Sequence, residues 1–236
     1  MTHLRGKRGG RRRIAVADLM KKNLNAFVLL MTMLAGPFFA AAAEESPLTT
    51  TQEQLVRSVE DHYRDLTDLT AAVTQKNTLK SVGKSQTFNG TLFIKKPGKL
   101  RLDYTNGQII LIDGKAALFY SKKSEQVIRK TFTDFEQMNI PVAFLLGASH
   151  IRDDFEVVQP EPRAPGLFEL LPRRPKAAMK KLRIQADEAG RITGLVIFDK
   201  SGNTTEIRFT DIREGAGLDD RLFLFKAPKG TEVIEQ

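Results

Sequence analysis

The sequence predicts a mainly β protein, built on an antiparallel sheet of about eleven or twelve strands with two or three helical pieces. Three observations predict it. Short runs in which apolar and polar residues alternate recur along the chain from residue 68 onward. Turn signals such as Pro97-Gly98, Asn106-Gly107 and Asp113-Gly114 separate these runs. A helical pattern precedes the first run, so a helix is available to cover the sheet.

The first element is expected to be an amphipathic helix over residues 52–66. Apolar side chains recur there at helical spacing, at Leu55, Val56, Val59, Tyr63 and Leu66. Threonines just before this stretch can cap the helix.

The strands follow in two groups with a different segment between them. We expect strands over residues 68–81, 85–96, 99–106, 107–114, 115–123, 125–132, 153–159, 166–173, 179–187, 191–200, 204–214 and 222–228. Their short connections favour pairing of consecutive strands into an antiparallel meander. In the segment 133–148, apolar residues around Pro141 predict a short helix, a kink and a second short helix ending near Gly147.

The N-terminal part of the chain is typical of a cleaved secretory signal peptide. Lys21 and Lys22 precede an apolar run over residues 26–39, which four alanines follow. The apolar run is shorter than the roughly 20 residues that a membrane span requires, which disfavours the alternative of an uncleaved anchor. Cleavage is expected after Ala43.

Residues 1–43 are therefore interpreted as an N-terminal extension with a signal peptide, and residues 44–236 as a single domain. Because Met20 would already begin a normal signal peptide, we hypothesise that translation starts there. The N-terminal part also carries most of the charge. The whole chain has a net charge of +9, but residues 1–43 hold eight of its 37 Lys and Arg and one of its 28 Asp and Glu, which leaves 29 and 27, or +2, for the domain. Nothing in the domain requires a nucleic acid partner.

The sequence contains no cysteine, which limits the cellular compartments in which the protein is expected. Exported domains of eukaryotes usually contain disulfides, so an exported domain without them suits the bacterial periplasm. It also leaves no cysteine to which a lipid anchor could be attached. A soluble periplasmic protein is expected.

The domain shows no constellation of residues that would support catalysis or metal binding. Its two histidines, His62 and His150, are expected to lie at the surface, and they are too few for a zinc site without cysteine. The stretch Val82–Ser85 resembles the end of a phosphate-binding loop, but the required first glycine is Thr78. We expect no catalytic residues, no metal and no cofactor, so the protein is not expected to be an enzyme.

The strands are unusually apolar. In residues 99–104 the alternation places Leu100, Leu102 and Tyr104 on one face, whereas residues 109–112 are apolar without interruption and require cover on both faces. Such a sheet must be closed or covered. Two interpretations remain open at this point: the helices fill the apolar face as an ordinary core, or they form a lid over a cavity for lipid tails.

Five stretches together resemble the outer-membrane lipoprotein carrier protein family (LolA). They are VTQK after the first helix, GTLFIKKPGKLRLDY at residues 90–104, IDGKAALFY at residues 112–120, PVAFLL at residues 141–146 and FLFKAPKGTEV at residues 223–233. They occur in the family's order over nearly all of residues 50–236. The resemblance implies a curved antiparallel sheet, an unclosed barrel of about 11 strands, capped by helices around a hydrophobic cavity.

The resemblance also implies a function and a set of site residues. The family carries triacylated lipoproteins across the periplasm from an inner-membrane ABC lipoprotein-releasing complex to an outer-membrane lipoprotein receptor, and a monomeric chaperone of this kind is expected. The implied acyl-chain cavity is lined by Phe93, Leu100, Leu102, Tyr104, Ile110, Ile112 and Phe119, and its lid contains Val142, Phe144 and Leu145. Lys96 stands where the family has a lid-latching arginine, and is expected to act as the latch although a lysine lacks the planar fork.

Energetics favour incomplete burial of the cargo. Three acyl chains hold about 45 methylenes, whose full burial would be worth on the order of 35 kcal/mol, whereas affinities saturate near 20 kcal/mol. A carrier must also release its load. The alternatives are a periplasmic lipid- or lipoprotein-binding sensor of the same fold that does not shuttle, and an outer-membrane receptor, which would need a lipidated cysteine.

Overall fold

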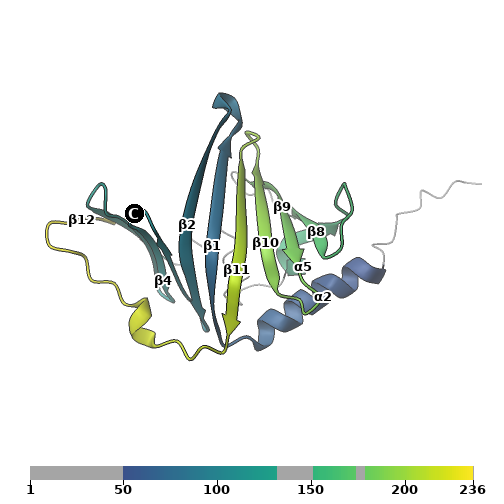
Figure 1. The fold of residues 1–236 in the computed structure, drawn as a ribbon, viewed down its shortest axis with the longest axis horizontal. Coiled ribbons are helices and arrows are strands. Elements are labelled where there is room, and N and C mark those ends of the chain that lie inside the picture. Colours follow the sequence, from purple (N-terminus) through teal and green to yellow (C-terminus); the bar gives the residue numbers. More distant parts are fainter. Residues whose placement is uncertain (1–49, 132–150, 174–178, 236) are drawn as a thin grey trace, which may run out of the picture. The chain divides into compact units, whose positions relative to one another are not determined.

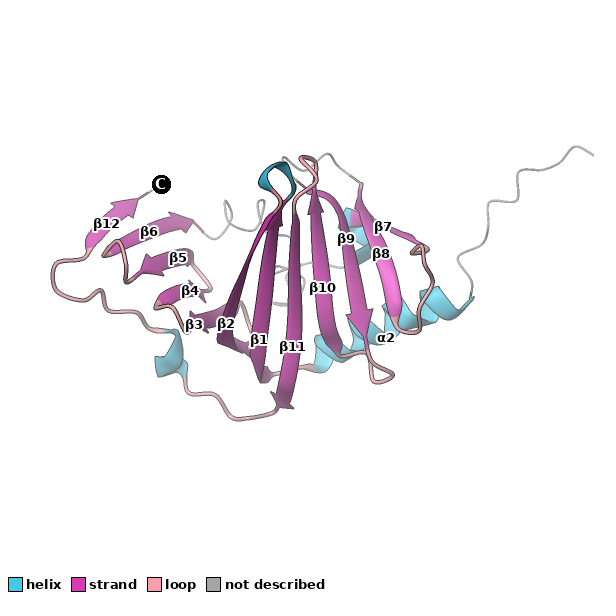
Figure 2. Cartoon of the chain, turned by 45° about the horizontal axis from the view of Figure 1, so that its top comes forward, coloured by secondary structure: helices cyan, strands magenta, loops and turns pink. Residues whose placement is uncertain are grey.

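The computed structural model describes residues 50–131, 151–173 and 179–235. All of them belong to one compact unit, Ser46–Gln236. Its twelve strands form a single sheet (Figures 1 and 2). The elements are α2 (Thr50–Asp65), β1 (Asp68–Leu79), η1 (Lys80–Val82), β2 (Lys84–Lys95), β3 (Lys99–Tyr104), β4 (Gln108–Asp113), β5 (Ala116–Ser121), β6 (Gln126–Thr131), α5 (Ile151–Asp154), β7 (Phe155–Val158), β8 (Leu167–Pro172), β9 (Met179–Ala186), β10 (Ile192–Asp199), β11 (Thr204–Glu214), η2 (Asp220–Phe223) and β12 (Glu232–Glu235).

The strand order is β12-β6-β5-β4-β3-β2-β1-β11-β10-β9-β8-β7. Every neighbouring pair is antiparallel except β12 with β6, which is parallel. The first strand therefore lies inside the sheet, between β2 and the late strand β11. The two edge strands, β12 and β7, do not pair with each other among the described residues, so the sheet is unclosed. The predicted mainly β fold with a long antiparallel sheet is confirmed.

One face of the sheet, called the inner face below, carries the main core. Side chains alternate between the faces of a strand, and the inner set includes Val73, Leu92 and Leu182, all buried. The helix α2 lies across this face (Figures 1 and 2). It buries Val56, Val59, Tyr63 and Leu66 at helical spacing against the strands, so the predicted amphipathic helix is confirmed to within two residues at its start and one at its end.

The opposite, outer face is covered over β3 and β4 by the C-terminal segment. The Arg101 guanidinium of β3 donates to the carbonyl oxygen of Leu222 at 2.9 Å. Asp220 bridges the ammonium groups of Lys95 and Lys99 at 2.8 and 3.0 Å. Phe223 is fully buried there. Leu111, which faces the same side as its cross-strand partner Arg101, is also buried, so β4 is covered on both faces as its uninterrupted apolar run predicts.

The predicted strand over residues 222–228 is wrong. The structure has η2 followed by an irregular extended segment, and the strand β12 comes later, at Glu232–Glu235. Asp219 caps η2 by accepting from the backbone N–H of Arg221 at 2.8 Å. The apolar alternation is nevertheless real: Phe223 is buried and Phe225 contacts the Tyr120 ring, whereas Leu224 between them is exposed. A segment lying across a sheet face alternates as a strand does, without pairing at an edge.

Other boundaries shift by only one or two residues. The strand predicted over 153–159 begins at Phe155, because Ile151–Asp154 form the short helix α5. The helices expected within 133–148 lie outside the described residues. None of the described helices has the length and apolar character needed to cross a membrane.

Candidate functional site

The inner face carries apolar side chains from β2 to β10, but these side chains differ in how deeply they are buried. At one end of β2 to β4, Ile94, Leu100 and Ile112 are buried. Elsewhere on this face, Leu102, Ile110, Phe119, Ile197 and Ile207 pack against this core but remain only partly buried. The described residues therefore leave an uncovered apolar half, and this half is the candidate site.

A groove of about 380 Å³ lies within this uncovered half. Its apolar lining comes from β2 to β6, namely Phe88, Tyr104, Ile110, Phe119 and Ile128. Its polar lining includes Gln75, Asn77, Gln108 and Gln126 at the end of the groove farther from α2. The groove is thus apolar along one side and polar toward one end, as a site for an amphipathic ligand requires.

Tyr104 is the best-defined polar group in the groove. Its hydroxyl donates to Oε1 of Gln75 at 2.6 Å. Its ring meets the Phe88 ring edge to face, with centroids 5.9 Å apart. Burial raises the pKa of Tyr104 to about 12, so the hydroxyl stays protonated and keeps its donor role at physiological pH.

The structure separates the seven residues predicted to line a cavity into three groups. Tyr104, Ile110 and Phe119 line the groove, and Leu102 lies on the same face beside it. Leu100 and Ile112 also face inward but are already buried.

Phe93 does not belong with the others. It stands opposite Arg101 in the register, on the outer face, while Leu92 and Ile94 on either side of it point inward. All residues of this run are apolar, so its composition alone does not assign a face. The register with Leu100 and Leu102, whose cross-strand partners are Ile94 and Leu92, does assign it.

Lys96 contacts the cover of the sheet. It follows β2 directly, and its ammonium group donates to the carbonyl oxygens of Tyr63 and of Arg64, the latter at 3.4 Å. Both carbonyls belong to the last turn of α2, where a cation also interacts favourably with the helix dipole. Burial lowers the pKa of Lys96, and the nearby Asp65 opposes this effect. The described contacts thus tie Lys96 to α2; the predicted lid residues Val142, Phe144 and Leu145 lie outside the described residues.

A second polar contact ties α2 to the sheet. Nε2 of His62 lies 2.9 Å from Oε1 of Glu214 on β11, with 18% of the histidine side chain exposed. His62 is therefore a bridging residue rather than a solvated surface histidine. His150 lies outside the described residues.

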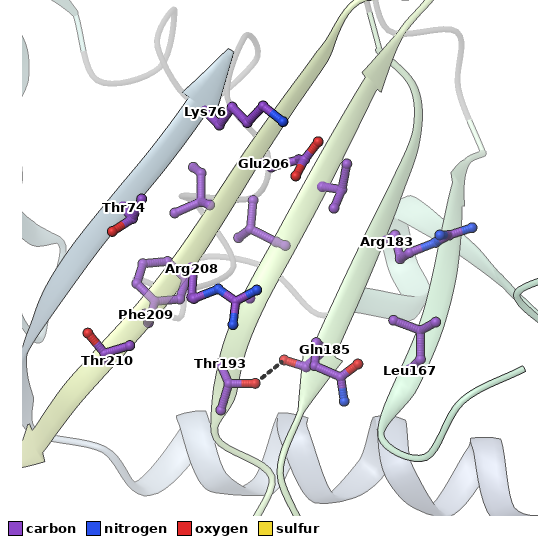
Figure 3. A pocket seen from close by; sticks show the side chains of 14 residues that line it. Thr74, Lys76, Leu167, Arg183, Gln185, Thr193, Glu206, Arg208, Phe209 and Thr210 are labelled. Carbon is purple, nitrogen blue, oxygen red and sulfur yellow. Dashed lines mark hydrogen bonds between the residues drawn. The ribbon is translucent and has the colours of Figure 1, made fainter. Parts of the chain in front are cut away.

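A larger hollow of about 650 Å³ lies on the outer face, over β1, β11, β10, β9 and β8 (Figure 3). Its lining is mostly polar and includes Lys76, Arg183, Glu206 and Arg208. In Figure 3 these side chains stand on the side of the sheet away from α2. The groove has no charged side chain in its lining, and a lipid tail in the outer hollow would have to displace water from four charged groups, so size alone does not make the hollow the candidate site.

No three His, Cys, Asp or Glu side chains within the described ranges gather closely enough to hold a metal ion. The groove also holds no paired acid and base among the residues that line it. Its chemistry is that of binding by apolar contact.

Comparison with known proteins identifies the family. The sequence profile of "Outer membrane lipoprotein carrier protein LolA" matches residues 64–226, well over half of the chain. This chain belongs to the LolA family. An outer-membrane lipoprotein carrier protein of Methylococcus capsulatus is 29% identical over 201 residues, which cover 84% of this chain and 91% of that protein. The protein of the same description from Cupriavidus necator is 30% identical over 154 residues, 64% of this chain and 72% of that one.

Solved structures resemble the fold of this LolA-family chain more distantly. A LolA superfamily protein of Nitrosomonas europaea aligns with a TM-score of 0.43 and 12% identity, over 74% of this chain and 98% of that one. An uncharacterised conserved protein of Thermus thermophilus aligns with a TM-score of 0.49 and 13% identity, over 78% and 99%. The family profile and the sequence relatives confirm the resemblance predicted from the five sequence stretches, and the family is one of carrier proteins.

The sequence analysis missed part of the groove of this LolA-family chain. Phe88, Ile128 and Gln75 line it but were not predicted. Phe88 and Gln75 could have been found from the register of β1 with β2, which pairs them directly. Ile128 pairs with Phe119, which was predicted, so the same rule would have found it.

Proposed function

We propose that this protein is a periplasmic carrier that binds the acyl chains of triacylated lipoproteins in the inner-face groove. It would receive them from an inner-membrane ABC complex and deliver them to an outer-membrane receptor. The observation that carries the proposal is the division of the inner face into a buried part and an open part with a largely apolar groove. Its membership of a lipoprotein-carrier family supports the same role.

The size of the groove fits a carrier that must release its load. A volume of about 380 Å³ holds on the order of a dozen groups the size of a water molecule. Three acyl chains contain several times that number of methylenes. The groove would therefore either bury only part of the cargo or widen when the cargo binds. In both cases the net binding free energy would be smaller than that of full burial.

One way to expose more of the inner face is a movement of α2 on the sheet. The helix is held by apolar burial along one side and, at its C-terminal end, by the contacts of Lys96 and His62. Polar contacts of this kind are individually weak, so they can break while the sheet stays folded. Lys96 is thus proposed as a latch on α2.

The proposal is tested by adding the purified protein to spheroplasts of its own organism and assaying the supernatant for triacylated lipoproteins. Wild-type protein is expected to release them in a 1:1 complex. Ile110→Asn, which places an amide in the groove, is expected to lower release severalfold because an apolar contact is replaced by a group that must be desolvated. Val196→Asn makes the same change on a half-buried outer-face valine and is expected to leave release unchanged.

Two results would change the assignment. If the protein binds a fluorescent fatty acid but releases no lipoprotein, it is a lipid-binding module that does not shuttle. If it does neither, the inner face is a filled core and the proposed function is wrong.

A further inference from the structure

Four large apolar side chains are at least half exposed in the part of the chain that the structure describes. They are Leu79 (50%), Val82 (58%), Leu224 (70%) and Val233 (52%). Leu79 and Val82 lie together, at the turn between β1 and β2 that η1 forms. The other two lie apart from them in the C-terminal segment. Apolar side chains that gather at a solvent-exposed position commonly mark an interaction surface.

A second turn lies against this one. The backbone N–H of Lys80 donates to Oδ1 of Asn203 at 3.0 Å. The aliphatic chain of Lys80 also lies against Gly202, where an added Cβ would stand 2.7 Å from its Cδ. The turns between β1 and β2 and between β10 and β11 therefore form one surface, which we call the hairpin tip (residues 79–84 and 199–203). Figures 1 and 2 show the two turns side by side at one end of the sheet.

The hairpin tip is basic. It contains Lys80, Lys84 and Lys200, and its one acidic residue is Asp199. The Asp199 carboxylate already accepts from the backbone N–H and the side-chain amide of Asn203, at 2.8 and 2.7 Å. Among the described residues, neither Lys80 nor Lys84 forms a salt bridge. The tip therefore presents exposed apolar side chains among positive charges.

The tip is also rigidly supported. Strands β1 and β2 pair residue by residue from Asp68 with Lys95 to Leu79 with Lys84. Gln75 and Asn77, which line the groove, lie on the same strand as Leu79 and share its face by alternation. At about 3.3 Å per residue, Leu79 stands roughly 7 Å beyond Asn77 along the strand.

We propose that the hairpin tip docks on the surface of an anionic lipid bilayer. Leu79 and Val82 would enter the interface between head groups and acyl chains, and the lysines would lie over the anionic head groups. Charge complementarity favours a lipid bilayer as the binding partner. A surface that is both basic and apolar matches a lipid interface, which offers negative charge and hydrocarbon within a few ångströms of each other. The docking does not depend on cargo in the groove.

The experiment uses the chain from residue 44, which contains the whole described core and all twelve strands and lacks the apolar leader. Without cargo, it is expected to co-sediment with vesicles of phosphatidylcholine and phosphatidylglycerol. Binding to vesicles of phosphatidylcholine alone is expected to be about tenfold weaker or more, because the lysines then have no anionic partner. If the chain does not bind the anionic vesicles, the proposal is wrong, even if the tip is later found to contact a protein.

Matched variants locate the binding surface. The double variant Leu79→Gln/Val82→Thr is expected to lower anionic-vesicle binding about tenfold, and Leu224→Gln/Val233→Thr, with comparable exposure, is expected to leave it unchanged. Lys80→Gln/Lys84→Gln is expected to lower binding about tenfold, and the turn variant Lys122→Gln/Lys123→Gln is not. Equal losses in a tip variant and its control overturn the proposal.

A variant whose fluorescence changes on binding distinguishes a loss of vesicle binding from a loss of folding. The chain contains no tryptophan, so Val82→Trp introduces a single fluorophore at the tip, and Val233→Trp places one elsewhere. Vesicles are expected to shift the Val82→Trp emission to shorter wavelength and brominated lipids to quench it, with neither effect for Val233→Trp. An unshifted Val82→Trp emission at saturating vesicles overturns the proposal. Ile110→Asn is expected to keep full vesicle binding, which separates this proposal from the groove.

Discussion

Single residues tie the cover of the sheet to its strands. Lys96 is the clearest case, because a residue in the turn after β2 reaches the last turn of α2. A lysine contributes a point charge, whereas an arginine would offer a planar fork that can address two carbonyls at once. The desolvation that lowers the pKa of Lys96 offsets part of what these contacts contribute.

The latch can be tested by substitution at position 96. Lys96→Met is expected to lower the free energy of unfolding by about 1 kcal/mol, because the helix end loses its cation and two carbonyls lose a donor. Lys96→Arg is expected to match or exceed wild-type stability. Urea unfolding followed by circular dichroism measures both. Lys115→Met, at an exposed turn position, is the control; an equal effect there would show that Lys96 has no special role.

Glu169 is the most buried carboxylate of the described strands, with 5% of its surface exposed. The Lys181 ammonium lies 2.9 Å from both of its oxygens, and Nε of Arg183 lies 2.8 Å from one. Burial by itself would raise the pKa of Glu169, but the hydrogen bonds and charges of Lys181 and Arg183 outweigh burial and lower it below 4.5. The ionised form is therefore favoured by folding.

A depressed pKa gives a defined pH dependence. The stability that Glu169 contributes is present above the unfolded-state pKa, near 4.5, and is lost as pH falls through the lower folded-state pKa. Glu169→Gln is expected to lower the free energy of unfolding by about 1–2 kcal/mol at pH 7, since Lys181 and Arg183 remain partly solvated. This difference from wild type should shrink below pH 4.5. Glu156→Gln, exposed on β7, should show neither effect, and a difference independent of pH would contradict the assignment.

At the scale of elements, α2 is held chiefly by its apolar side. Val56 and Val59 are completely buried against the strands, whereas Arg57 between them is exposed. Because tertiary packing supplies most helix stability in proteins, these side chains matter more than helix propensity. The polar contacts at its C-terminal end then decide where the helix stops, not whether it forms.

Val59→Ala is expected to lower the free energy of unfolding by about 2 kcal/mol, because it leaves a cavity under the helix. Arg57→Ala, on the exposed side of the same helix, is expected to change it by less than about 0.5 kcal/mol. Thermal and urea unfolding report both. A loss for Arg57→Ala as large as that for Val59→Ala would mean that helix formation, rather than packing, limits stability.

The elements were largely predictable from sequence, and the failures have physical causes. Alternation and turn residues predict eleven of the strands and α2 closely, because those signals are local. The segment over residues 222–228 alternates for a different reason, since it crosses a sheet face. The short strand β12 pairs in parallel with β6 from more than 100 residues away, and four residues carry too little pattern to reveal that.

The candidate site was predictable in part. Alternation places Tyr104 on an apolar face, whereas Ile110 and Phe119 were expected from the family resemblance, and all three line the groove. Neither kind of reasoning distinguishes these residues from Leu100 and Ile112, which are buried. That distinction depends on what packs over each strand. Phe93 shows the other limit, because an uninterrupted apolar run leaves its face undefined until the register is known.

At the scale of the molecule, one sheet serves two opposite purposes. Its inner face contributes the core that folds the domain and, beyond α2, an apolar groove that stays open. The C-terminal segment covers part of its outer face, and a polar hollow lies over the rest. Leaving apolar surface uncovered costs stability, so its retention is expected where a ligand covers it in use.

If the open half of the inner face holds acyl chains, photo-crosslinking from the chains will label the residues that line it. A lipoprotein whose acyl chains carry a diazirine is loaded onto the protein, irradiated, and the labelled residues are read by tandem mass spectrometry. Labels are expected on Ile110, Phe119 and Ile128, and labelling is expected to be lost in Ile110→Asn. Labels confined to the outer face, at residues such as Gln185 or Arg208, or no labelling of a loaded complex, would contradict it.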